Sequence, residues 1–198
     1  PSPEAKLDLL RLAIDKLGQA GYEYIGMDHF ALPGDELARA QRGGSLHRNF
    51  MGYTTHAESD LVGLGVSAIS HIGASFSQNP RDLPSWEMAI DAGRLPVWRG
   101  MYMDEDDVIR ADLIQALMCH GALDFRAFEQ RHMIDFGAYF SESLARLKPL
   151  QDDGLVELDA GGLRATSRGR LLLRLIAMCF DPYLTPAAAP AQPRSSRH

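Results

Sequence analysis

The sequence is poor in cysteine and has no long apolar run. It contains two cysteines, Cys119 and Cys179, which form no Cys-x-x-Cys pair, so we expect two buried free thiols and no metal site of this chain's own. No apolar run approaches the length of about eighteen residues that a transmembrane helix needs, and no signal peptide opens the sequence. We therefore expect a soluble, cytoplasmic protein with no membrane partner.

Basic residues are also scarce. The chain carries 20 Lys and Arg against 26 Asp and Glu, a net charge of -6, and between residues 104 and 160 thirteen acidic side chains stand against five basic ones. Affinity for nucleic acid comes chiefly from clustered Lys and Arg, so this balance argues against a nucleic-acid partner. The remaining composition, 45% hydrophobic over 198 residues, is that of one globular domain or two small ones.

Helix and strand signals alternate over the first hundred residues, which favours an α/β fold. Ser2 is suited to cap a first helix that stops at Gly18 or Gly21, and the broad apolar face of this helix needs a partner, which suggests the downstream part of something larger. We expect further helices at 35–42 and 83–92, strands at 22–27, 48–54, 61–69 and 96–103, and a loop at 74–79.

The two strands at 48–54 and 61–69 are interrupted by glycines. Glycine inside an apolar run indicates close backbone approach or a bulge, so we expect two buried strands shaped to admit a ligand or a neighbour. The string Gly63-Leu-Gly-Val-Ser-Ala68 also satisfies a loose dinucleotide fingerprint, but that motif must open a helix. A Gly-rich buried strand is therefore favoured over a Rossmann site.

A change of composition near residues 100–104 marks a domain boundary, which separates a domain at 1–103 from one at 104–184. The second domain should hold helices from Asp104 to Gly121, at 125–132 and at 134–147, then a hairpin around 159–162 and a last helix. Helices followed by a hairpin suggest a winged-helix-like module, for which DNA binding is the less favoured use on this acidic background. We expect the tail at 185–198 to be disordered.

Several segments in order resemble the oxygen-independent coproporphyrinogen III oxidase, a radical S-adenosylmethionine (SAM) enzyme of haem biosynthesis. They are Gly26-Met-Asp-His-Phe-Ala31, Leu46-His-Arg-Asn-Phe50, Gly52-Tyr-Thr-Thr55, Gly63-Leu-Gly-Val-Ser-Ala-Ile-Ser70 and Met178-Cys-Phe-Asp181. The resemblance implies an oxidoreductase that converts two propionates of coproporphyrinogen III to vinyl groups, giving protoporphyrinogen IX. It further implies the last strand-helix units of a partial, curved TIM-like barrel, followed by a mostly helical C-terminal domain over its mouth.

The family holds a 4Fe-4S cluster on a Cys-x-x-x-Cys-x-x-Cys loop, and two distant cysteines cannot supply three ligands in one loop. The resemblance therefore implies that the cluster ligands lie in a missing N-terminal half, that no catalytic or metal-binding residue lies in this fragment, and that it is inactive alone. The implied partners are that half, coproporphyrinogen III and an electron donor or acceptor protein. The complete enzyme is expected to be a monomer.

The resemblance also assigns roles to single residues. Phe50 and Ile69 match positions that line the SAM pocket in the family. Met51 stands where the family usually has Gln. The side-chain amide that could hydrogen-bond a second SAM molecule is therefore absent. Arg48 and His47 are candidates to meet propionates, since a guanidinium matches a carboxylate in a bidentate manner, although ion pairing at a strand end is an equal alternative. His29 and Tyr53 are the other substrate-site candidates. The alternative function is a haem- or porphyrin-binding relative without radical chemistry.

Overall fold

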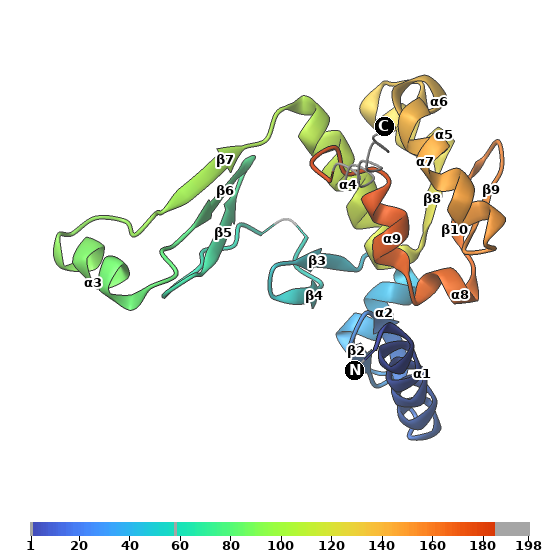
Figure 1. Cartoon of the computed structure of the whole chain (residues 1–198), viewed down its shortest axis with the longest axis horizontal. Helices are drawn as coiled ribbons and strands as arrows, with labels where there is room; N and C mark the ends of the chain where they lie inside the picture. Colours follow the sequence, from blue (N-terminus) through green and yellow to red (C-terminus); the bar gives the residue numbers. More distant parts are fainter. Residues whose placement is uncertain (1, 58, 185–198) are drawn as a thin grey trace, which may run out of the picture.

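The computed structural model describes residues 2–57 and 59–184, so the tail expected at 185–198 lies outside it. An arm made of a three-stranded sheet and one helix extends away from a helical body (Figure 1). Up to residue 102 the elements are α1 (Pro3–Gln19), β1 (Glu23–Gly26), β2 (His29–Ala31), α2 (Glu36–Gly43), β3 (His47–Asn49), β4 (Gly52–Thr54), β5 (Ile69–Ile72), β6 (Ser75–Gln78), α3 (Leu83–Asp91) and β7 (Arg99–Tyr102). The later elements are α4 (Glu105–His120), β8 (Ala122–Asp124), α5 (Phe125–His132), α6 (Phe136–Tyr139), α7 (Ser141–Asp152), β9 (Val156–Leu158), β10 (Gly162–Ala165), α8 (Ser167–Arg170) and α9 (Leu173–Met178).

The helices predicted in the first half are confirmed, and their ends have local causes. The Ser2 hydroxyl accepts a hydrogen bond from the Ala5 N–H at the start of α1, and Asp35 does the same for Leu37 at the start of α2. Gly44 ends α2 in a left-handed conformation, with φ of 73°. None of the residues of α1 is buried, and Leu9 is 57% exposed.

The strand predicted at 48–54 is wrong: this segment is a tight hairpin. Asn49 faces Gly52 across the turn, so β3 and β4 pair antiparallel around Phe50 and Met51. The Asn49 side-chain oxygen accepts a hydrogen bond from the Met51 N–H, and Gly52 has a φ of 128° that favours glycine. These two features reverse the chain in the middle of the predicted strand.

The buried strand predicted at 61–69 is also wrong. Leu61 forms an isolated bridge to His71 and Ile69 begins β5, but residues 62–68 form no strand. Val62 and Leu64 are 62% and 87% exposed. The close backbone approach expected at these glycines is present at Gly63, where a Cβ would lie 2.6 Å from the carbonyl oxygen of Ile69, but not at Gly65, where a Cβ would meet nothing within 4 Å. The segment leads into β5 and not into a helix, so the Rossmann alternative is excluded for it.

The mixed α/β class is confirmed, but the described strands form four small sheets in which every pair is antiparallel. The parallel strand-helix units of a barrel are therefore not formed among these residues. The largest sheet of the first half has the order β5-β6-β7, and its middle strand, β6, falls in the segment predicted as a loop. The strand predicted at 96–103 is confirmed as β7.

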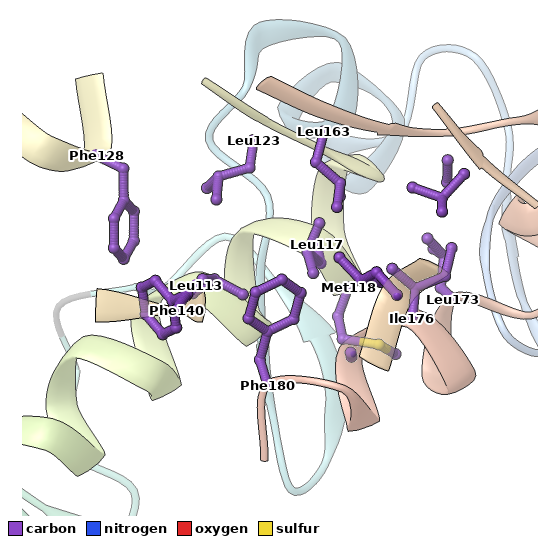
Figure 2. Packing of buried hydrophobic residues seen from close by; sticks show 14 of the residues in the cluster. Leu113, Leu117, Met118, Leu123, Phe128, Phe140, Leu163, Leu173, Ile176 and Phe180 are labelled. Carbon is purple, nitrogen blue, oxygen red and sulfur yellow. The ribbon is translucent and has the colours of Figure 1, made fainter. Parts of the chain in front are cut away.

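In the second half, α4, α5, the β9–β10 hairpin and the last helical segment follow the prediction. The helix predicted at 134–147 is wrong in its bounds: Asp135 caps the short helix α6, and α7 runs past Pro149 to Asp152. The core of this half packs around α4, with Leu113, Leu117, Phe140, Ile176 and Phe180 pointing toward one another (Figure 2). Each of these five side chains is at most 1% exposed, so the helices form one cohesive unit.

A second, smaller core joins the first half to α4. Its members are Ile25, Ala31, Ala38, Ala40, Leu46, Tyr53 and Cys119. Because α4 contacts both β1 and β3, this core fixes the β3–β4 hairpin against the C-terminal helices. Among the described residues, no helix is both long and apolar enough to cross a membrane.

Candidate functional site

One face of the β5-β6-β7 sheet forms an apolar hollow of about 500 Å³ with the β3–β4 turn. Ile69 pairs with Gln78 and Phe76 pairs with Met101, so alternate residues of the three strands share this face. Phe50 extends from the turn and packs edge-on against Phe76, with 5.5 Å between ring centroids. We call this site the Phe50–Ile69 hollow; its lining residues are Phe50, Ile69, Phe76, Ser77, Gln78, Arg99, Gly100 and Met101.

The hollow carries a fixed polar group at the end where β6 meets β7. The Arg99 Nε donates a hydrogen bond to the Gln78 side-chain oxygen at 2.9 Å, and its guanidinium lies over the Trp98 ring. His71 stacks on the Phe76 ring at 4.2 Å between centroids, which holds that ring in place. The arrangement offers an apolar wall with one cation and one amide, the composition of a small-molecule site.

Of the three residues matched to the family's cofactor pocket, the structure brings Phe50 and Ile69 together. Met51 does not line the hollow: it is 82% exposed at the tip of the turn. The sequence missed Phe76 because β6 reads as a polar loop. It missed Met101 because the pairing of β7 with β6, which places Met101 opposite Phe76, carries no local signal.

Tyr53 and His29 lie on the other side of the hairpin, in a packed cluster. The Tyr53 hydroxyl donates a hydrogen bond to the Met118 carbonyl at 2.9 Å. The rings of Tyr53 and His29 meet edge-on, with 5.1 Å between their centroids. Burial raises the pKa of Tyr53 to about 12, with Cys119 adding to the effect and Arg48 opposing it. Tyr53 therefore stays protonated and ties β4 to α4, which is a structural role.

His29 lies next to a carboxylate, that of Asp28. Its Nδ1 lies 2.9 Å from an oxygen of Asp28, in the geometry of an ion pair and not of an aligned hydrogen bond. Its Nε2 faces Gly52, where any Cβ would collide with the ring. Glycine at this position thus lets the imidazole pack directly against the hairpin.

Arg48 lines a second cavity, of about 330 Å³, where the hairpin meets α4 and α9. Its Nε is buried and has no hydrogen-bond acceptor in the described part of the chain, while its guanidinium carbon lies 5.8 Å from the centre of the Tyr53 ring. His47 is half-buried on the same strand, opposite Thr54. We call this cavity the junction cleft; it is lined by Met27, Arg48, Ile114, Met118, Arg174, Ala177, Met178, Asp181 and Leu184.

The two cysteines are free, as expected, but Cys179 is half-buried and not buried. Cys119 is buried, and burial raises the pKa of its thiol to about 12; the pKa of Cys179 is also raised by burial. Both thiols are therefore neutral, unlike metal-binding thiolates. Residues 2–57 and 59–184 contain no group of three His, Cys, Asp or Glu side chains placed to hold a metal ion.

The chain is similar in sequence to one family model and to several known proteins. Residues 103–172 match the family model described as the HemN C-terminal domain. Over 184 residues the chain is 52% identical to the oxygen-independent coproporphyrinogen III oxidase of Salmonella typhimurium and 50% identical to that of Escherichia coli. Each match covers 93% of this chain and 40% of the relative, so the chain spans about two-fifths of the length of these relatives.

A solved structure agrees with the sequence matches. It is that of coproporphyrinogen III oxidase (HemN) from Escherichia coli, described as a radical SAM enzyme. It superimposes with a TM-score of 0.87 at 51% identity, over 93% of this chain and 42% of that one. The resemblance inferred from the sequence motifs is confirmed.

Proposed function

We propose that this chain is the C-terminal part of an oxygen-independent coproporphyrinogen III oxidase, a radical SAM enzyme of haem biosynthesis. Relatives that are half identical to this chain over 93% of its length bear that name. In the reaction, each of two propionate side chains loses carbon dioxide, one proton and two electrons and becomes a vinyl group. When SAM is bound, the radical that it supplies would take one hydrogen atom, that is, the proton together with one of the electrons. The second electron requires an acceptor, which we expect to be a separate protein.

The observation that carries the proposal is the Phe50–Ile69 hollow. Phe50 and Ile69 come from separate segments, yet both line one apolar cavity, as expected for two residues that share a cofactor pocket. The hollow fits part of SAM: Phe50 and Phe76 offer aromatic faces for a flat base, and Arg99 offers a cation for a carboxylate. SAM, when bound, supplies the radical; the residues of this chain hold it and exclude water.

The iron-sulfur cluster does not fit the described residues. A cluster needs several thiolates close together, whereas Cys119 and Cys179 are neutral thiols without a ligand group around them. We therefore assign the cluster to the part of the enzyme that this chain does not span.

Met51 lies beside Phe50 at the tip of the turn, where it can contact a ligand seated on the hollow.

The arrangement of the elements is consistent with two domains. We propose that residues 1–103 complete one side of a partial barrel built mainly by the rest of the enzyme, which would cover the exposed residues of the arm, such as Trp98, Met101 and Tyr102. We propose that residues 104–184 form a winged-helix-like domain, given the order of α4, β8, α5, α7 and the β9–β10 hairpin. The complete enzyme is proposed to act as a cytoplasmic monomer.

The proposal is tested with a joined enzyme, in which this chain follows the part of the E. coli relative that precedes the matched segment. Supplied anaerobically with SAM, a reductant and an electron acceptor, the joined enzyme should convert coproporphyrinogen III to protoporphyrinogen IX. We expect a rate within about a hundredfold of the E. coli enzyme, since a misplacement of about 1 Å can cost that much. Chromatography of the oxidised porphyrins measures the product.

The 198-residue chain and the E. coli segment alone are the controls, and neither should form product. A joined enzyme that holds its cluster and binds SAM but forms no product would overturn the proposal. If that protein still bound coproporphyrin III, the result would favour the alternative function, a porphyrin-binding relative without radical chemistry.

A further inference from the structure

We propose that the junction cleft binds one carboxylate of the substrate, with Arg174 of α9 acting beside Arg48 of β3. The inference deepens the proposed function and takes its ligand class from it. Both side chains line one cavity, although they come from opposite ends of the chain. The cleft exists because α4 packs against β3 on one side and against α9 on the other (Figure 1).

The charges of the cleft favour an anion. Neither guanidinium forms an ion pair with a carboxylate in the described part of the chain, and the buried Nε of Arg48 has no acceptor. Asp181 is the acidic residue of the lining, and one of its oxygens accepts a hydrogen bond from the Tyr183 N–H. Two cations against one carboxylate leave a net positive charge, and a buried donor without a partner is costly unless a ligand supplies the acceptor.

The walls of the cleft favour an apolar body behind that carboxylate. Six lining side chains are apolar, and three of these are methionines, whose flexible thioethers adapt to irregular and aromatic surfaces. The volume of about 330 Å³ lies at the lower end for ligand sites, so the cleft suits one side chain of a large ligand and not a whole macrocycle. A propionate on a tetrapyrrole has this chemistry.

The two arginines differ in burial and in the other contacts that they make. Arg48 is half-buried, so its charge is less screened by solvent, but it also packs over Tyr53. The Arg174 side chain is exposed and makes no hydrogen bond or ion pair in residues 2–57 and 59–184, so its replacement breaks no polar interaction of the fold. Arg174 is therefore the residue that tests the site.

The test titrates coproporphyrin III, the unreactive oxidised form of the substrate, into the 198-residue chain and follows its fluorescence. The second probe is coproporphyrin III tetraamide, which has the same shape without charge. We expect the acid to bind more tightly than the amide, and Arg174→Gln to weaken binding of the acid by roughly fivefold, since exposed arginine-carboxylate pairs contribute modestly. Arg174→Lys should fall between the two, because it keeps the charge and loses the bidentate geometry.

Arg126→Gln is the matched control. Arg126 is an exposed arginine of α5, outside the cleft, so its replacement changes the net charge equally and should leave both affinities unchanged. A change of less than twofold for Arg174→Gln, or equal affinity for acid and amide, would overturn the inference. If the chain associates in solution, the same titrations are made on the joined enzyme.

The joined enzyme separates this inference from the proposed function. There, Arg174→Gln should raise KM for coproporphyrinogen III and leave kcat nearly unchanged. If the joined enzyme forms product and its KM does not change in Arg174→Gln, the proposal for the cleft is wrong and the proposed function is supported. If the joined enzyme forms no product while its affinity for coproporphyrin III still depends on Arg174, the proposed function is wrong and the proposal for the cleft is supported.

Discussion

Replacing Gly169 by Ala should strongly destabilise the helical second half of the chain. Gly169 is buried in α8, and a Cβ at this position would overlap the carbonyl oxygen of Leu155, which is backbone and cannot rotate away. That carbonyl also accepts the hydrogen bond from the Thr166 N–H, so moving it disturbs the start of α8. We expect Gly169→Ala to lower the free energy of unfolding by roughly 3 kcal/mol, the upper range for overpacking a well-filled core.

Gly137→Ala is the control for the Gly169 substitution. It also places Ala for Gly in a helix, but there the new Cβ would lie 3.6 Å from an oxygen of Asp135, an ordinary contact. Because Ala favours helix, this variant should be neutral or slightly stabilising, by less than about 1 kcal/mol. Urea unfolding followed by circular dichroism measures both variants. Equal stability of Gly169→Ala and the parent would show that β9 and α8 are not packed as described.

Ile69→Asp in the joined enzyme should abolish most of its activity. The substitution places a carboxylate in the Phe50–Ile69 hollow, where the apolar wall cannot satisfy it. A ligand that packs on this wall would be displaced, and we expect product formation to fall by about a hundredfold or more, as for other misplacements of reacting groups. The affinity for SAM, measured by equilibrium dialysis, should fall with it.

Ile72→Asp is the matched control for Ile69→Asp. Ile72 lies on the same strand, β5, but three residues later its side chain faces the opposite side of the sheet and is 48% exposed. This variant should keep the affinity for SAM within about threefold of the parent, since its carboxylate points away from the hollow. If the two variants lost affinity for SAM equally, the effect would come from the sheet as a whole and not from the hollow.

The sequence predicted the helices well because their ends carry local signals. Asp104 and Asp107 form a reciprocal cap at the start of α4, and Gly121 ends that helix in a left-handed conformation. The helix at 125–132 was predicted with the bounds that the structure shows. These features depend on a few neighbouring residues, so they can be recognised without knowledge of the tertiary fold.

Two of the four strands predicted in the first half, those at 48–54 and 61–69, are wrong because the signals that decide them are not local. The loop of the β3–β4 hairpin consists of Phe50 and Met51. Two-residue loops typically contain Asn-Gly or Asp-Gly, so this loop gives no turn signal in the sequence. The apolar residues Val62 and Leu64 suggest a buried strand, yet both are exposed in this chain. Their apolar pattern thus predicted a strand where the chain forms a loop.

The candidate site was predicted in part. The family resemblance named Phe50 and Ile69, and the structure brings them to one hollow; composition alone would not have paired them. Phe76, Met101 and Arg174 were missed, because each joins its site through sheet register or helix packing. Tyr53 was also named as a site candidate; its hydroxyl donates a hydrogen bond to the Met118 carbonyl, and its role in the site stays a prediction.

The central claim is that one face of the β5-β6-β7 sheet closes a cofactor cavity in a longer enzyme. Hydrogen-deuterium exchange of the joined enzyme, with and without SAM, tests this claim most directly. We predict that SAM slows exchange by roughly tenfold at residues 69–78 and 99–102, since bound ligand stabilises the segments it contacts, and leaves α3 unchanged. Protection by SAM elsewhere in the joined enzyme, with none on these strands, would contradict the account.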